Sequence, residues 1–284
     1  MRRIPAIISW LGSTLVIVVL VMIGSTILVR YAPGYLSDPG EMDSRYAHTV
    51  RAELSEEAAR SHSITQMLIT EIKGMIRGSG GISRQFDVPV FELIRPRLAI
   101  TGELLLRSLL VGWTLALCAA LLGSAGEKPS LLWQAPATLL LAVPTAAMAT
   151  LCLLAGKGGP VLVMALLIAA RDFKFLHRLL RKAWLEPHVL QAHAQGIRPL
   201  RLLVAHLWPA FVTQLAALAS LSIVTALSAL VPVEVLFNVP GLGQLAWNAA
   251  LNRDLPVLLA VTLTMAIAVA CSGMAPSRKV ELCA

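Results

Sequence analysis

The residues that could do chemistry in this 284-residue chain are few, and they form no catalytic pattern. None of the six histidines belongs to an HExxH pair, and neither a Ser-His-Asp set nor a nucleophile elbow is visible. The cysteines are scattered without CxxC or Cys/His ligand spacing, which predicts neither a disulfide framework nor a metal site; they are Cys118, Cys152, Cys271 and Cys283. We therefore predict a non-catalytic chain without a metal or cofactor of its own.

A Gly-Lys-Gly sequence at 156–158 invites comparison with phosphate-binding loops. In the pattern GxxxxGK[ST] another glycine stands five residues before the glycine of the Gly-Lys pair, and a Ser or Thr follows the lysine. Here Leu151 occupies the earlier position, and no Ser or Thr follows Lys157. We expect a tight turn over 156–160 and no nucleotide site.

One charged pair stands inside an apolar run, formed by Glu103 and Arg107. At helical spacing the two side chains meet, and pairing offsets part of the cost of placing charges near lipid. We expect a structural pair, with a contact to a transported substrate as the alternative.

The composition is that of an integral membrane protein. Hydrophobic residues make up 57% of the chain and charged residues only 14%, and the mean hydropathy is +0.74. Soluble domains average roughly 25% charged residues. The net charge of +8 comes without a basic stripe interleaved with aromatics, so we expect no nucleic-acid partner. An excess of Lys and Arg in cytoplasmic loops explains the positive net charge instead.

Six apolar runs predict an all-α membrane bundle. Most of these runs are close in length to the roughly twenty residues that a helix needs to cross a hydrocarbon core of about 30 Å. Pro136 and Pro144 are expected to kink the third run, and the basic second half of the fourth is expected to project into the cytoplasm. The predicted spans are 7–29, 99–123, 131–155, 161–180, 211–230 and 255–271.

The spans also predict the division and orientation of the chain. Residues 1–30 hold the first span, which is longer than a signal-peptide core and lacks a small-x-small cleavage site. Residues 31–98 form an extracytoplasmic loop, with an amphipathic helix predicted over 64–76. Residues 99–284 form the main transmembrane domain. Six spans place both termini and the basic cluster in the cytoplasm, as the positive-inside rule expects. Almost no acid falls within the runs, which counts against a proton-coupled transporter.

A polar stretch over 186–210 interrupts the C-terminal half. A short helix ending near Gly196 is expected there, because glycine commonly ends helices in the left-handed conformation. Ala192, Gly196 and Pro209 have the spacing of the cytoplasmic EAA loop of ABC-importer permeases, which the stretch resembles, with Leu190 where the naming acid stands in that family. The alternative is a plain surface helix in a cytoplasmic loop.

Three further segments resemble permeases of the dipeptide/oligopeptide type. Gly-Ser-Gly-Gly-Ile-Ser at 78–83 is similar to a Gly-Asp-x-Gly-x-Ser element, with Ser79 in place of the acid. Residues 235–245, Val-Leu-Phe-Asn-Val-Pro-Gly-Leu-Gly-Gln-Leu, and residues 252–256, Asn-Arg-Asp-Leu-Pro, resemble the segment before the last span. The proline and glycines let the chain turn sharply before a short helix over 245–251. This segment is expected to line the outer end of a pathway, with a plain connecting loop as the alternative.

The resemblance implies a diverged permease subunit of an ATP-driven ABC importer in the bacterial inner membrane. Its implied partners are a second homologous permease, two ATP-binding subunits or domains that hold ATP and Mg²⁺, a solute-binding protein and membrane lipid. The substrate that the resemblance favours is a peptide or a similar small solute, with nickel chelates, sugars and opines as alternatives. A structural or assembly subunit without transport is the alternative.

The resemblance also implies which residues form the sites. The coupling loop is 181–205, and the implied ATPase-coupling residues are Leu190, Gln191, Ala192, His193, Ala194, Gln195, Gly196, Arg198 and Pro199. The implied outer-mouth residues are Glu234, Phe237, Asn238, Pro240, Gly241 and Gly243.

Overall fold

The computed structural model describes most of the chain from residue 80 onward. The described residues are 80–83, 85–124, 130–184, 208–252 and 254–272, with isolated positions in the first predicted span and between 186 and 195. The described positions between 12 and 27 are helical, in agreement with a first span. The amphipathic helix predicted over 64–76 lies outside the described residues.

The described residues are helical apart from turns and an antiparallel bridge between Ile82 and Pro89. Three of the described helices contain stretches long and apolar enough to cross a membrane, Val90–Gly123, Gln214–Leu236 and Leu255–Ser272, and a bent pair makes a fourth candidate. The all-α membrane class is confirmed, while the count of six spans stays a prediction. The helices are α4 (Val90–Ser124), α5 (Ser130–Ala142), α6 (Thr145–Leu154), α7 (Pro160–Trp184), α10 (Trp208–Leu236), α11 (Leu242–Leu251) and α12 (Leu255–Ser272).

The chain divides into two compact units. One comprises residues 1–98 and 245–268, and the other comprises residues 99–244 and 269–284. The chain passes between the units within three of its helices, α4, α11 and α12.

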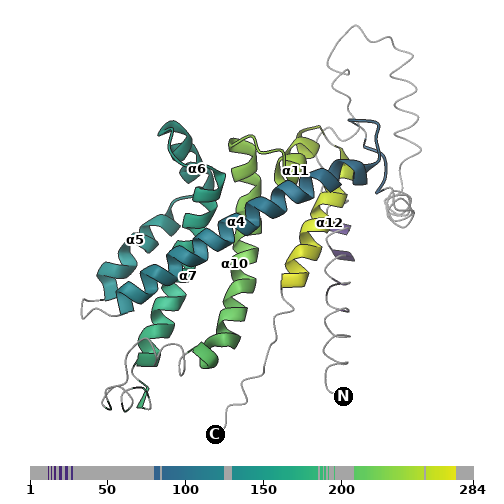
Figure 1. Cartoon of the computed structure of the whole chain (residues 1–284). Coiled ribbons are helices and arrows are strands. Elements are labelled where there is room, and N and C mark those ends of the chain that lie inside the picture. The colour runs from purple at the N-terminus through teal and green to yellow at the C-terminus, as the bar shows by residue number, and fades with distance from the viewer. Residues whose placement is uncertain are drawn as a thin grey trace, which may run out of the picture. The chain divides into compact units, whose positions relative to one another are not determined.

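Helix α7 is at the centre of the second unit. Both α5 and α10 pack against α7, and α6 packs against α7 and α10. Figure 1 shows α7 and α10 side by side, with α4 crossing them. Each helix therefore buries one face against a neighbour and leaves apolar residues exposed on the other, as expected of helices that face lipid.

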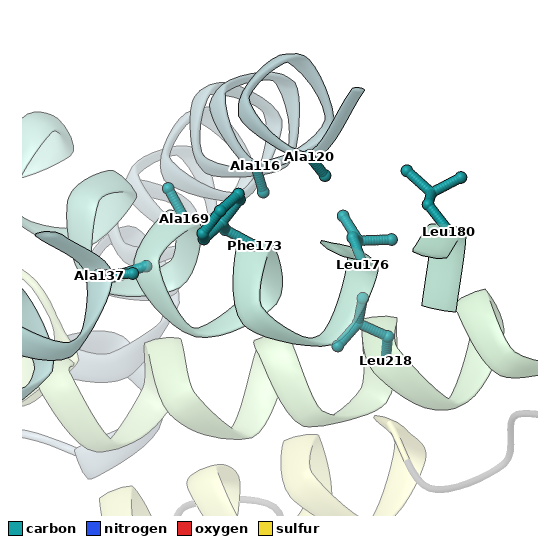
Figure 2. Close-up of a cluster of buried hydrophobic side chains, with 9 residues drawn as sticks. Ala116, Ala120, Ala137, Ala169, Phe173, Leu176, Leu180 and Leu218 are labelled. Carbon is teal, nitrogen blue, oxygen red and sulfur yellow. The ribbon is translucent and has the colours of Figure 1, made fainter. Parts of the chain in front are cut away.

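Small residues on α4 form its contact with α7. Ala116 and Ala120 face Phe173 and Leu176 of α7 in a buried cluster that also includes Leu218 of α10 (Figure 2). Small side chains let membrane helices approach closely and gain dispersion contacts along their length.

Gly112 lies at a close approach of α4 to α7. A Cβ built on Gly112 would stand 3.0 Å from the carbonyl oxygen of Ala165 and 3.0 Å from the Cβ of Ile168. Backbone atoms of α7 cannot move aside as a flexible side chain can, so a residue larger than glycine would be crowded at this position.

The third predicted span is two helices and not one kinked helix. α5 ends at Ala142, α6 begins at Thr145, and their axes differ by 95°. Pro144 has an extended conformation, with φ −57° and ψ 140°, and it lacks the N–H that would continue the helix. Pro136 lies within α5, so the bend falls at the break that contains Pro144 and not at Pro136.

Several local expectations are confirmed. Glu103 and Arg107 form the expected ion pair, and both side chains are exposed. Gly156 and Gly158 have positive φ angles of 60° and 94° in the turn between α6 and α7. The fourth predicted span stays a prediction, because its helix, α7, is not among the described helices apolar enough to cross a membrane. α7 continues to Trp184, with basic residues on its exposed face that include Arg178, Arg181 and Lys182.

Gly112→Val should destabilise the bundle by forcing α4 away from α7. Overpacking of this kind costs about 1–3 kcal/mol. The measurement is the thermal unfolding temperature of the purified protein in mild detergent. Gly102→Val is the matched control, because Gly102 lies on the same helix and a Cβ added there would meet nothing within 4 Å. Equal unfolding temperatures for the two variants would contradict the close approach.

Candidate functional site

The C-terminus of α10 is closed by a Schellman motif. Asn238 has a left-handed backbone with φ 51°, a conformation that asparagine adopts more readily than most residues. The Val239 N–H donates to the carbonyl of Glu234 (2.8 Å), and the Asn238 N–H donates to the carbonyl of Val235 (3.2 Å). Pro240 follows and prevents continuation of the helix. The chain therefore turns sharply after α10, as the sequence predicts.

The side chain of Glu234 caps the next helix, α11. Its Oε2 accepts hydrogen bonds from the N–H groups of Gly243 (2.7 Å) and Gln244 (3.2 Å). Both N–H groups belong to the first turn of α11, where they have no partner within the helix. The carboxyl group also faces the positive end of the helix dipole. Because Glu234 is 0% exposed, these hydrogen bonds replace the ones that its carboxyl group would otherwise make to water.

Thr101 connects α4 to this cap. Its hydroxyl donates to Oε1 of Glu234 (2.8 Å) and accepts a hydrogen bond from the Leu242 N–H (2.8 Å). A hydroxyl has one proton and two acceptor sites, so it can serve both partners at once. One buried carboxyl group and one hydroxyl thus hold α4, α10 and the start of α11 together.

Gly241 and Gly243 provide the space that this cap needs. A Cβ on Gly241 would collide with the carboxyl group of Glu234, and a Cβ on Gly243 would lie 2.9 Å from the Cα of Val231. At Gly241 the carboxyl group fills the volume that a side chain would occupy. At Gly243 the backbone of α11 rests directly on α10.

The structure brings together four of the six residues predicted at the outer mouth. Glu234, Gly241 and Gly243 form the cap, and Asn238 accepts a hydrogen bond from the side chain of Gln244 (2.7 Å). Phe237 and Pro240 lie on the turn without a hydrogen bond to the cap among the described residues. Whether this turn lines a pathway stays a prediction.

A second buried carboxyl group occurs in the other unit. Asp254 is 1% exposed and precedes α12, where its Oδ1 lies 3.5 Å from the Val257 N–H. Its Oδ2 accepts hydrogen bonds from the hydroxyl of Ser83 (2.5 Å) and the N–H of Gln85 (3.2 Å). Asp254 therefore caps α12 and binds the turn that precedes α4.

Few of the predicted coupling residues fall among the described residues. Gln191 is helical and exposed, and Gln195 is exposed one turn later, with its N–H bonded to the carbonyl of Gln191 (3.1 Å). Leu190, Ala192, His193, Ala194, Gly196, Arg198 and Pro199 lie outside the described residues.

Residues 109–277 match the family described as binding-protein-dependent transport system inner membrane component. The match covers more than half of the chain and includes the α10–α11 turn. The chain belongs to this family. Members are permease subunits of ABC transporters, so the resemblance seen in the sequence is confirmed.

Two similar proteins are themselves named as permeases. The metal-staphylopine import system permease protein CntB of Staphylococcus aureus is 31% identical over 108 residues, which is 38% of this chain and 34% of CntB. A Brucella ovis protein named as a peptide permease is 28% identical over 106 residues, which is 37% of this chain and 33% of that protein. The match thus spans about a third of the length of these relatives.

The sequence of this permease chain does not reveal the partners of either cap. Thr101 lies 133 residues from Glu234, and Ser83 lies 171 residues from Asp254. No local pattern connects residues so far apart. Asp254 itself carries a usable signal, because an aspartate directly before an apolar run is typical of a helix N-cap.

Glu234→Ala should strongly destabilise the permease chain. It removes the acceptor for two buried N–H groups and for the Thr101 hydroxyl, and each unpaired buried donor costs about 1–3 kcal/mol. Thermal unfolding in detergent measures the effect. Glu103→Ala is the control, because exposed ion pairs contribute at most about 1 kcal/mol. A Glu234→Ala protein as stable as this control would show that the cap contributes nothing.

Ser83 and Asp254 should be energetically coupled. In a double-mutant cycle of Ser83→Ala and Asp254→Ala, the loss of stability in the double variant should be smaller than the sum of the single losses. Directly bonded residues show interaction energies of about 0.5–3 kcal/mol. Additive losses of unfolding free energy would contradict the hydrogen bond.

Proposed function

We propose that this chain is a permease subunit of an ATP-driven importer and forms half of the translocation pathway. The observation that carries the proposal is the family match over 109–277, which includes both the cytoplasmic loop and the capped α10–α11 turn. The second half of the pathway comes from a second permease, and the energy comes from two ATP-binding subunits. An extracytoplasmic binding protein delivers the solute near residues 31–98 and the α10–α11 turn.

The proposed contact with the ATPase is the loop that follows α7, centred on 186–200. Gln191 and Gln195 form an exposed helical turn at this point in the chain. A short helix with polar and small residues can sit in a groove of a partner, and small residues let the partner approach closely. Movement of the ATPase would then shift α7 and the helices packed on it.

The proposed substrate is a peptide or a similar small solute, such as a metal chelate. The support is the naming of the relatives, one as a metal-staphylopine import permease and one as a peptide permease.

Gly196→Asp should uncouple the importer while leaving the chain in the membrane. The new carboxylate would occupy the face that the ATPase contacts, and burying it unpaired costs several kcal/mol. The measurement is retention of the ATPase during purification, with solute uptake in vesicles as the functional readout.

Gly159→Asp is the matched control for this variant. Gly159 lies in the turn between α6 and α7, and a Cβ there meets nothing within 4 Å. It should retain both the ATPase and uptake. Normal uptake by Gly196→Asp would remove the loop from the proposed mechanism.

A further inference from the structure

Two side-chain hydrogen bonds join α4 to α10 in the second unit. The outer link is the bond from the Thr101 hydroxyl to Oε1 of Glu234, which belongs to the cap (2.8 Å). The inner link is the bond from the indole Nε1 of Trp113 to the hydroxyl of Ser222 (3.2 Å). The linked residues are 133 and 109 positions apart in the chain, so neither link follows from local structure.

The inner link extends to α7. The Ser222 hydroxyl donates to Oδ2 of Asp172 (2.6 Å) while it accepts from Trp113, and a hydroxyl group can do both at the same time. Ser222 and Asp172 are both 0% exposed, so water cannot replace their hydrogen bond when it breaks. One serine therefore connects α4, α7 and α10.

The two links are equally spaced on the two helices. Trp113 follows Thr101 by twelve residues on α4, and Glu234 follows Ser222 by twelve residues on α10. Twelve residues of α-helix span about 18 Å. The outer link comes first on α4 and last on α10, so the two helices run in opposite directions between the links. Because the spacings agree, one alignment forms both hydrogen bonds, and a slide of one helical turn, about 5.4 Å, breaks both.

The buried face of α4 between the links does not itself specify this alignment. It presents Leu104, Ser108 and Gly112. The Ser108 hydroxyl has no hydrogen-bond partner in the described part of the chain, and the other two residues make only non-directional contacts. A hydrogen bond weakens steeply outside a narrow range of distance and angle. The two links are therefore the interactions that distinguish one register of α4 and α10 from its neighbours.

We propose that Trp113 and Ser222 are positioning residues whose link, together with the Thr101–Glu234 link, fixes α4 and α10 in one register and thereby places the outer turn. Two links on one pair of helices support each other, because once one has formed the other needs little further ordering. Asp172 extends the fixed register to α7, which leads into the loop proposed to bind the ATPase. A role in transmitting movement from the ATPase rests on the proposed function, whereas the fixed register does not.

A double-mutant cycle between the two links tests the shared register on the purified full-length chain in mild detergent. Thr101→Val removes the outer hydroxyl, and Trp113→Phe removes the inner N–H. Each should lower the unfolding temperature by about 3 °C or more. Effects at sites this far apart without a shared partner normally add. The double variant should instead lose clearly less than the sum of the two single losses, because losing the first link already weakens the second.

Ser228→Ala is the matched control for the inner substitution in this cycle. Ser228 is exposed on α10, and its hydroxyl donates to the carbonyl of Thr225 on the same helix (2.8 Å). Its loss should add to that of Thr101→Val. Additive losses for Thr101→Val and Trp113→Phe would show two independent hydrogen bonds and would overturn the proposal.

A distance measurement tests the register without relying on the unfolding temperature. Spin labels at Leu122 and Leu236, exposed residues toward opposite ends of the α4–α10 pair, report the register by double electron–electron resonance once the native cysteines are replaced by serine. The wild-type chain should show one narrow distance distribution. Trp113→Phe leaves no buried donor unpaired and should fold, but its distribution should be broader. A distribution as narrow as that of the wild type would overturn the proposal.

The transmitting role is tested separately in the complex with the ATPase. When Mg-ATP and orthovanadate are added to trap the ATPase during hydrolysis, the distance between the labels should not change, because both links persist. A second population at another distance would overturn the transmitting role. If the chain binds no ATPase, the proposed function fails, while smaller-than-additive losses in the isolated chain would still establish the fixed register.

Discussion

The buried carboxyl group of Glu234 is the constraint on which the α10–α11 turn depends. A helix that begins inside a membrane protein exposes N–H groups that lipid cannot satisfy. Glu234 accepts two of these N–H groups and the hydroxyl of Thr101, which in turn accepts a third. The glycines at 241 and 243 follow from this arrangement, because the carboxyl group and the backbone of α10 occupy the space of their side chains.

The other buried polar side chains obey the same requirement in different ways. Asp254 caps α12 and receives the Ser83 hydroxyl, while Asp172 meets the Ser222 hydroxyl between helices. In each case a side chain on one element satisfies a polar group on another that is remote in sequence. Such bonds are directional and expensive to leave unmade, so they fix helix register where apolar contacts such as Ala116 with Phe173 allow sliding.

How much of the structure can be predicted from the sequence depends on whether the interacting residues are close to one another in the chain. Apolar runs predict the membrane helices, and Asn-Val-Pro-Gly at 238–241 predicts the turn after α10, because these signals are local. The sequence predicts a kink at Pro144, but the 95° angle depends on how α5 and α6 pack on α7. The sequence also assigns Asp172 to a basic, projecting half-helix. Its buried orientation follows from the face that α7 presents to α4 and α10, which composition alone does not reveal.

The proposed work of this family member as the permease subunit of an ATP-driven importer depends on its partners in the membrane. Purification of the chain from its native membrane in mild detergent, followed by mass spectrometry of the bound proteins, identifies those partners. We expect recovery of ATP-binding subunits and a second multi-span permease. A large membrane complex without any ATPase would contradict it and make the chain a structural subunit.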